Sequence, residues 1–169
     1  MIRHCEHCGA PLPGRPPVQC AHCQGWIFFN AKPAAGAVLV EGGRFLAVRR
    51  AKAPAAGLWG LPGGFCEGSE HPTDAAVREV YEETRLRVTL GPLIGLYVDN
   101  YAYQGEAAPT LNTYYLAGLT TPAQHVVSAD DAADAGWFDL ADPPPFAFDH
   151  LHAVIADACA LLDRQAAGG

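Results

Sequence analysis

The chain has 169 residues, of which half are hydrophobic, and a formal net charge of −7. This length accommodates one ordinary domain and a small additional module. No apolar run is long enough to cross a bilayer, and the acidic balance argues against a general binder of nucleic-acid phosphates. The first residues lack the apolar stretch of a secretory signal. We therefore expect a soluble, cytoplasmic protein without a membrane partner, for which nucleic acid is an unlikely ligand.

Two Cys-x-x-Cys pairs lie near the N-terminus and are separated by eleven residues: Cys5/Cys8 and Cys20/Cys23. Each pair can offer two thiolates to one ion, so together they predict a closed tetrahedral Cys₄ site for structural Zn²⁺. Disulfides or a redox pair are the alternative. His7 and His22 lie inside the pairs and are interpreted as bystanders rather than ligands.

Residues 1–30 have little apolar periodicity, so we expect zinc to hold them as a small ribbon. Gly9 and Gly25 follow the cysteine pairs, where a tight turn favours a residue that tolerates positive φ. The apolar segment 26–29 is expected to cover the ribbon or to dock it on the next domain.

A second domain is expected over residues 33–169. Segments 35–40 and 44–50 are predicted to be strands joined by a turn at Gly42-Gly43. After a loop over 51–57, a helix is predicted over residues 72–84.

The predicted helix carries three glutamates near its end, Glu79, Glu82 and Glu83. Residues three and four apart lie on one helical face, so these side chains point the same way. Like charges at this spacing repel, but a divalent cation with oxygen ligands turns the cluster into a binding site. The spacing therefore predicts a Mg²⁺ site, with the apolar side of the helix, including Ala76 and Val80, facing inward.

Further strands are predicted over residues 87–98, interrupted at Gly91-Pro92, and over 111–119 and 135–138. A proline-rich loop then leads to an amphipathic helix over 150–164. Strands, a helix, strands and a helix in this order are typical of a mixed α/β domain.

Residues 64–86 resemble the Nudix box, Gly-x5-Glu-x7-Arg-Glu-aliphatic-x-Glu-Glu-x-Gly-aliphatic. The matching residues are Gly64, Glu70, Arg78, Glu79, Val80, Glu82, Glu83 and Leu86. Arg85 is the one departure, because the family has glycine there. A glycine at this position ends the helix in a left-handed conformation, which costs another residue roughly 1 kcal/mol. We expect a stability penalty rather than a loss of chemistry.

The resemblance implies a Nudix α/β/α sandwich with a mixed sheet, preceded by the zinc ribbon, and hydrolysis of a pyrophosphate with Mg²⁺ or Mn²⁺. It implies four metal ligands, the carboxylates of Glu79, Glu82 and Glu83 and the backbone carbonyl of Gly63. Arg78 would orient or neutralise the carboxylates, and Glu70 would tie the preceding loop to the helix.

The resemblance leaves the general base open. The candidates are Glu79 and Glu82 in the box, and Asp130, Asp131 and Asp134 outside it, which an acidic turn also explains. Arg50 matches a position that often contacts substrate phosphate, although a solvated strand-end charge is an equal alternative.

A Cys₄ ribbon before a Nudix domain resembles the NADH pyrophosphatase group and related hydrolases of FAD or ADP-ribose. The NADH group's Ser-Gln-Pro-Trp-Pro-Phe-Pro signature is absent, since residues 143–150 do not match it. Four aromatic side chains could stack on a base or simply pack in the fold: Phe65, Tyr97, Tyr101 and Tyr103.

The leading hypothesis is a Mg²⁺-dependent pyrophosphohydrolase of a nucleoside diphosphate linked to another moiety, with a small-molecule nucleotide as substrate. A catalytically weak ligand sensor or adaptor, with the ribbon binding a partner, is the alternative. Action on the 5′ end of RNA is a third hypothesis, disfavoured by the low positive charge of residues 1–30. A homodimer is expected by analogy with the family.

Overall fold

The computed structural model describes residues 2–103, 106–121, 126–127 and 132–168. Along this part of the chain the elements are β1 (Val18–Gln19), β2 (Trp26–Ile27), β3 (Lys32–Glu41), β4 (Arg44–Arg50), β5 (Trp59–Gly60), β6 (Gly63–Phe65), α1 (Pro72–Thr84), β7 (Val88–Tyr103), β8 (Glu106–Leu119), β9 (Ala132–Asp139) and α2 (His150–Ala167). In these residues no helix is long and apolar enough to cross a membrane.

The main sheet is mixed and has β3 at its centre. Its strand order is β5-β4-β3-β8-β7, with β6 paired to β3 and β9 paired to β4. Strand β3 runs parallel to β8 and antiparallel to β4 and β6. Residues 35–39 of this strand are all buried, as expected for a strand covered on both faces.

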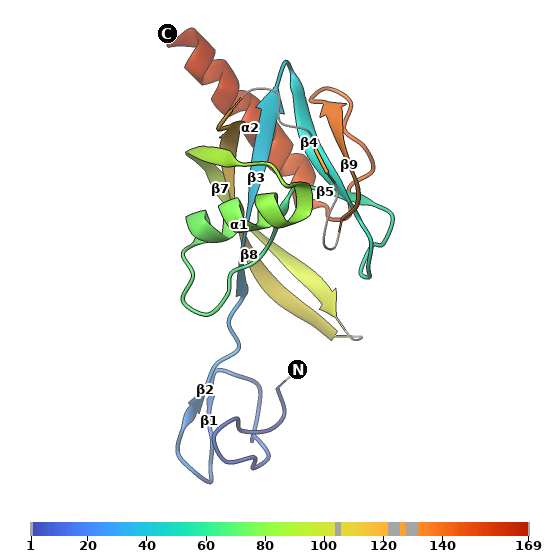
Figure 1. The fold of residues 1–169 in the computed structure, drawn as a ribbon. Helices are drawn as coiled ribbons and strands as arrows, with labels where there is room; N and C mark the ends of the chain where they lie inside the picture. Colours follow the sequence, from blue (N-terminus) through green and yellow to red (C-terminus); the bar gives the residue numbers. More distant parts are fainter. Residues whose placement is uncertain (1, 104–105, 122–125, 128–131, 169) are drawn as a thin grey trace.

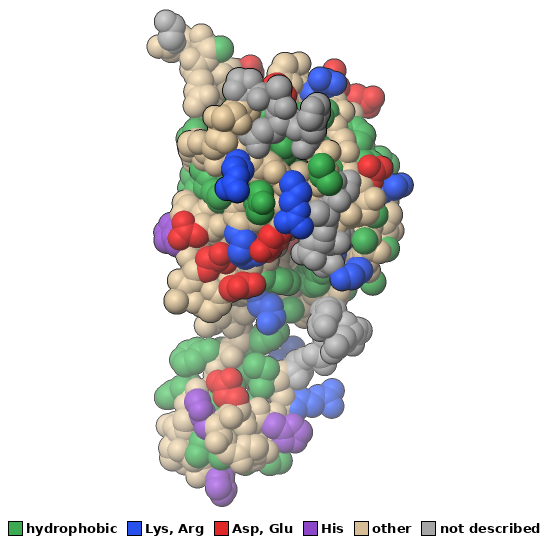
Figure 2. All heavy atoms as spheres, in the orientation of Figure 1, with side chains coloured by type: hydrophobic (Ala, Val, Ile, Leu, Met, Phe, Trp, Pro, Cys, Tyr) green, Lys and Arg blue, Asp and Glu red, His purple; other side chains and the backbone are tan. Residues whose placement is uncertain are grey.

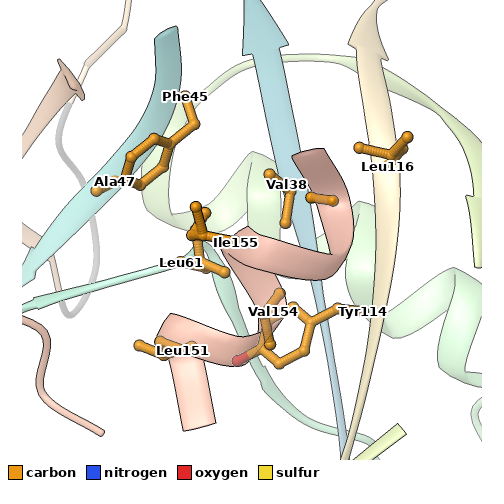
Figure 3. Packing of buried hydrophobic residues seen from close by; sticks show 10 residues of the cluster. Val38, Phe45, Ala47, Leu61, Tyr114, Leu116, Leu151, Val154 and Ile155 are labelled. Atoms are coloured by element: carbon orange, nitrogen blue, oxygen red, sulfur yellow. The ribbon is translucent and has the colours of Figure 1, made fainter. Parts of the chain in front are cut away.

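Helices α1 and α2 cover opposite faces of the sheet (Figure 1). Side chains alternate along β3, so Leu39 packs in a cluster with Val80 of α1, whereas Val38 packs with Val154 and Ile155 of α2 (Figure 3). The structure thus confirms the predicted α/β/α sandwich with a mixed sheet.

The predicted turn at Gly42-Gly43 is confirmed, with φ of +56° and +77°, but other predictions need correction. Strands β7 and β8 extend beyond the predicted 87–98 and 111–119 and form a long hairpin (Figure 1). The predicted interruption at Gly91-Pro92 is a register shift within β7. A proline is tolerated there because β7 lies at the sheet edge. Strands β5 and β6 were not predicted, since two or three residues show no periodicity.

The N-terminal ribbon lies beyond the start of β3 and contains the two-stranded sheet β1-β2 (Figure 1). Gly9 has the expected positive φ of +73°, but the second knuckle uses Gln24, at +61°, and not Gly25. A Cβ at Gly25 would lie 2.8 Å from the ring of His7, so close packing explains this glycine. Ile27 is buried in the ribbon, while Trp26, Phe28 and Phe29 are exposed.

Candidate active site and zinc centre

Helix α1 has a defined cap at each end. At its start, Nδ1 of His71 accepts a hydrogen bond from the N–H of Thr73 (3.3 Å), and Pro72 takes the first helical position. At its end, Arg85 adopts a left-handed conformation with φ of 60°, and its N–H donates to the carbonyl of Tyr81 (2.9 Å). The expectation that the residue replacing the family glycine is left-handed is confirmed.

The inward face of α1 is apolar, as predicted, and fully buried at Ala76, Val80 and Thr84. The other face presents Glu79, Glu82 and Glu83 to a cavity of about 520 Å³. In the space-filling view, acidic and basic side chains gather over α1 (Figure 2). The helix therefore places all three carboxylates against one cavity.

Arg78 connects the carboxylates of the loop and the helix. Its Nε and Nη2 donate to the two oxygens of Glu70, both at 2.9 Å, so the expected tie between loop and helix is present. Its Nη1 donates to Glu79 (2.8 Å) and Glu82 (2.9 Å), and Nη2 also donates to the carbonyl of Phe65 (3.1 Å). One guanidinium thus fixes three carboxylates and the loop backbone.

The pKa values reflect this arrangement. The hydrogen bonds from Arg78 and then from the N–H of Glu67 lower the pKa of Glu70 to about 2. The same contact with Glu70 is the main reason that the pKa of Arg78 is raised. Burial raises the pKa of Glu79, with Glu82 and Glu70 adding repulsion, although Arg78 opposes the effect. A further positive charge beside Glu79 would therefore be stabilising.

Two glycines bring the backbone of β6 against these carboxylates. The N–H of Gly63 donates to Oε2 of Glu83 (3.1 Å). A Cβ at Gly64 would lie 2.4 Å from Oε1 of Glu79, a distance that real contacts do not show. Only glycine at position 64 leaves room for the Glu79 carboxylate in this position. Coordination by the carbonyl of Gly63 stays a prediction.

The residues present fit a divalent cation in their chemistry. Carboxylate oxygens from one helical face are the donors that Mg²⁺ prefers, and the buried Glu79 favours a counter-charge. Their atoms do not form a tight group, since among the described residues only the cysteines bring three or more ligand atoms within 4.8 Å of one another. Arg78 holds the carboxylates of Glu79 and Glu82, whereas the N–H of Gly63 holds that of Glu83. Their role as metal ligands remains a prediction.

Another wall of the cavity contains both predicted substrate-binding residues, Arg50 and Phe65. Arg50 donates to the carbonyl of Pro54 (2.8 Å) and to the hydroxyl of Tyr101 (3.1 Å), and its guanidinium lies 5.1 Å from the ring centre of Phe148. These contacts hold Arg50 in the cavity wall and distinguish it from a solvated strand-end charge. The ring of Phe65 meets Tyr101 edge-on at 5.4 Å.

Of the predicted base candidates outside the box, the structure describes only Asp134. Asp130 and Asp131 lie outside the described residues. Asp134 forms an ion pair with Arg49 (3.3 Å) and is absent from the described residues that line the cavity. Asp134 lies within strand β9, paired with Arg49 of β4, so it is in a strand and not in the expected acidic turn.

The tyrosines predicted as candidates for stacking on a base differ in whether they line the cavity. Tyr101 lines the cavity, whereas Tyr97 donates to Asp157 (2.7 Å) and is not among the described residues that line it. The side chain of Tyr103 lies outside the described part of the chain. Of the two tyrosines whose side chains are described, Tyr101 therefore contributes to the cavity wall and Tyr97 does not.

Sequence reasoning missed several polar residues of this wall. Asp99 of β7, Tyr114 of β8 and His150 at the start of α2 all line the cavity. Nδ1 of His150 is hydrogen-bonded to Asp99, and Nε2 lies 3.4 Å from the hydroxyl of Tyr114. No local pattern could have found them, because they are far apart in sequence and meet only through the sheet.

The four N-terminal cysteines form a compact group within the ribbon. The Sγ atoms of Cys5 and Cys23 lie 3.6 Å apart, and those of Cys8 and Cys20 lie 3.8 Å apart. Tetrahedral zinc with Zn–S bonds of about 2.3 Å requires Sγ atoms about 3.8 Å apart. The group therefore fits Zn²⁺, with no histidine among its members.

The fold and the glutamate-bearing helix define a member of a large hydrolase family. The model of the NUDIX domain matches residues 30–159, and the chain belongs to this family. It is a Nudix-type hydrolase, acting on phosphoric anhydride bonds.

Two curated relatives and one solved structure illustrate the likeness. An ADP-ribose pyrophosphatase of Methanocaldococcus jannaschii is 29% identical over 124 residues, which are 73% of this chain and 71% of the relative. The NAD-capped RNA hydrolase NudC of Chromobacterium violaceum is 27% identical over 161 residues, which are 93% of this chain but only 58% of the relative. A NUDIX hydrolase from Nitrosomonas europaea superposes with a TM-score of 0.74 at 24% identity and covers 91% of this chain and 88% of its own. At this sequence identity, the likeness to the Nitrosomonas europaea structure shows a shared fold alone.

Proposed function

We propose that this protein is a Mg²⁺-dependent pyrophosphohydrolase of nucleoside diphosphates linked to a second moiety, with ADP-ribose as the first substrate to test. Residues 33–169 would form the catalytic Nudix domain and residues 1–30 a structural zinc ribbon. The observation that carries the proposal is that Glu79, Glu82 and Glu83 share one cavity with the aromatic and basic wall around Arg50.

The cavity suits a nucleotide derivative in size and character. Its volume of about 520 Å³ lies in the usual range for small-molecule sites. Phe65, Tyr101 and Phe148 offer ring surfaces for a base, and Arg50 offers positive charge for a phosphate. The acidic helix lies on another wall. The arrangement therefore supports a ligand that has both a base and a diphosphate.

The glutamates and Arg78 would have different roles in hydrolysis. Mg²⁺ held by Glu79, Glu82 and Glu83 would supply the charge that stabilises the diphosphate oxygens and makes water a better nucleophile. Glu79 or Glu82 would accept the proton of the attacking water. Arg78 would keep both carboxylates oriented, and Glu70 would hold Arg78 in place. With ADP-ribose, water adds to one phosphorus and the products are AMP and ribose 5-phosphate.

ADP-ribose is placed first because of the relatives. The M. jannaschii protein that matches 73% of this chain is an ADP-ribose pyrophosphatase. The NADH-group signature is absent from residues 143–150, which lowers the rank of NADH.

The proposal is tested by product analysis with purified protein and Mg²⁺ or Mn²⁺ on ADP-ribose, NADH, NAD⁺, FAD and diadenosine polyphosphates. We expect release of a nucleoside monophosphate that disappears in Glu82→Gln and in Glu83→Gln. Glu41→Gln is the matched control, because Glu41 is exposed at the end of β3 and does not belong to the described cavity lining. Equal turnover in all variants would refute the assigned site.

The ligand sensor or adaptor is the alternative outcome of the same panel. Tight binding of one compound by calorimetry, without product in overnight incubations, would favour it. The complete set of glutamates argues against it, because a sensor has no need of clustered carboxylates that repel one another.

A second substrate class has two observations in its favour. The likeness to NudC spans 93% of the chain, and the ribbon exposes Trp26 and Phe28, at 55% and 56%, with their rings stacked at 6.3 Å. Exposed aromatic rings can stack on the bases of single strands. If NAD-capped RNA is a substrate, it should be cleaved at a higher kcat/KM than NAD⁺, and Trp26→Ala should remove that advantage. Equal kcat/KM values for NAD-capped RNA and NAD⁺ would rule out this class of substrate.

A further inference from the structure

Asp99 and His150 form a polar pair in the cavity wall that the Nudix box does not include. The carboxylate of Asp99 on β7 binds Nδ1 of His150, the first residue of α2. The two side chains are largely enclosed, at 27% and 10% exposed. A carboxylate on Nδ1 fixes the ring orientation and leaves Nε2 as the nitrogen that can meet another partner.

Nε2 of His150 has only a weak partner within the described protein. The hydroxyl of Tyr114 lies 3.4 Å away, which is long for a hydrogen bond to nitrogen. Burial raises the pKa of Tyr114, with the charges of Glu83 and Asp99 adding to the effect, so this hydroxyl stays protonated. The charges of both the acidic helix and the Asp99–His150 pair therefore act on the hydroxyl of Tyr114.

The pair also continues the aromatic wall of the cavity. The rings meet in sequence, Phe65 with Tyr101 at 5.4 Å, Tyr101 with Phe148 at 5.9 Å, and Phe148 with His150 at 6.0 Å. Phe148 thus contacts Arg50 and His150, two nitrogen-bearing groups that can bind oxygen. A ligand that lies along this wall would reach Nε2 of His150.

We propose that His150, oriented by Asp99, is a substrate-binding residue whose Nε2 hydrogen-bonds to an oxygen of the nucleotide substrate. The proposal rests on the proposed function, since it concerns the same cavity. The oxygen belongs either to the nucleoside diphosphate or to the moiety linked to it, and the test below distinguishes the two.

A purely structural role is the competing explanation, because the pair also joins β7 to α2. The chain offers a matched control for that role. Tyr97 of β7 donates to Asp157 of α2 at 2.7 Å, so it joins the same two elements. Neither of these residues belongs to the described lining of the cavity. Asp157→Asn therefore weakens the attachment of α2 without touching the cavity.

The test measures ligand affinity without turnover. In a Glu83→Gln background with Mg²⁺, binding of ADP-ribose and of ADP is measured by calorimetry for His150→Ala, His150→Gln, Asp99→Asn and Asp157→Asn. We expect His150→Ala to weaken ADP-ribose binding at least tenfold, on the basis of one lost hydrogen bond to a charged or buried partner. His150→Gln, whose amide reaches the Nε2 position, should recover part of the loss, and Asp157→Asn should stay within twofold of the background.

The outcomes separate the possibilities. A loss for both ligands places the oxygen in the nucleoside diphosphate, and a loss for ADP-ribose alone places it in the linked sugar. If His150→Ala and Asp157→Asn lower the melting temperature alike and leave affinity unchanged, the pair is only a structural attachment and the proposal is wrong. If ADP-ribose binds normally but wild-type protein hydrolyses nothing in the panel, the proposed function fails while the binding role of His150 is still decided.

Discussion

Gly64→Ala tests the link between the β6 backbone and the acidic helix without changing any proposed ligand. The φ of Gly64 lies outside the left-handed region, so alanine is compatible with the backbone. The added Cβ would lie 2.4 Å from Oε1 and 2.6 Å from Cδ of Glu79. An ordinary contact needs about 3.5 Å, so the carboxylate must move by about 1 Å.

The displacement should affect chemistry far more than stability. The Glu79 carboxylate is the flexible end of a side chain and can move, so overpacking should cost about 1 kcal/mol, the lower end of the usual range. Part of this is offset because alanine restricts the unfolded chain by roughly 0.4–1 kcal/mol relative to glycine. A misplacement of about 1 Å at a reacting centre can cost about 100-fold in rate. We therefore expect kcat to fall about 100-fold with only a small change in melting temperature.

The assay is steady-state hydrolysis of the best substrate together with calorimetric binding of Mn²⁺. Gly118→Ala is the control, because a Cβ at this β8 position meets nothing within 4 Å. A double variant shows whether the effect passes through Glu79. Added to Glu79→Gln, Gly64→Ala should cost little further, as expected for two changes that act on one group.

Two results would refute the reasoning. Wild-type turnover in Gly64→Ala would mean that the position of Glu79 is unimportant for catalysis. A full additional 100-fold loss in the double variant would mean that the methyl group acts elsewhere in the cavity.

Three further predictions concern the ribbon, the loop and the end of α1. Removal of zinc by a chelator should unfold residues 2–29 alone, because only Cys5, Cys20 and Ile27 are buried in the ribbon core; hydrogen exchange that also rises across β3 would contradict this. Glu70 has a pKa lowered from 4.5 to about 2, so its ionised form stabilises the fold fully above pH 4.5, and this contribution is lost as the pH falls towards 2. The stability advantage of wild type over Glu70→Gln should therefore be constant above pH 5 and shrink below it, and a constant difference down to pH 2.5 would oppose the assignment. Arg85→Gly should change stability by no more than about 1 kcal/mol, because relief of the left-handed strain is offset by the lost contact with Tyr81 and the freer unfolded chain; a gain in turnover above tenfold would show that Arg85 limits the chemistry.

The sequence by itself determined those features of this protein that depend on residues close together along the chain. The bounds of α1, the buried face at Ala76 and Val80, and the pairing of the cysteines in one group follow from helical periodicity and from short ligand spacing. The resemblance to the Nudix box also implied that Glu70 ties the loop to the helix, which its hydrogen bonds from Arg78 do. These features depend on separations of a few residues, which the backbone geometry of a helix or a turn fixes.

Tertiary structure decided the features that join distant segments. The short strands β5 and β6 exist because neighbouring strands supply their hydrogen bonds, and no local periodicity marks them. The cavity wall around Arg50 includes residues of β4, β7, β8 and the start of α2. Asp99 and His150 are 51 residues apart, and their hydrogen bond forms because α2 packs across the sheet beside β7. Such a contact cannot be predicted from sequence spacing, because the packing of the helix on the sheet brings the two residues together and the length of the intervening chain does not.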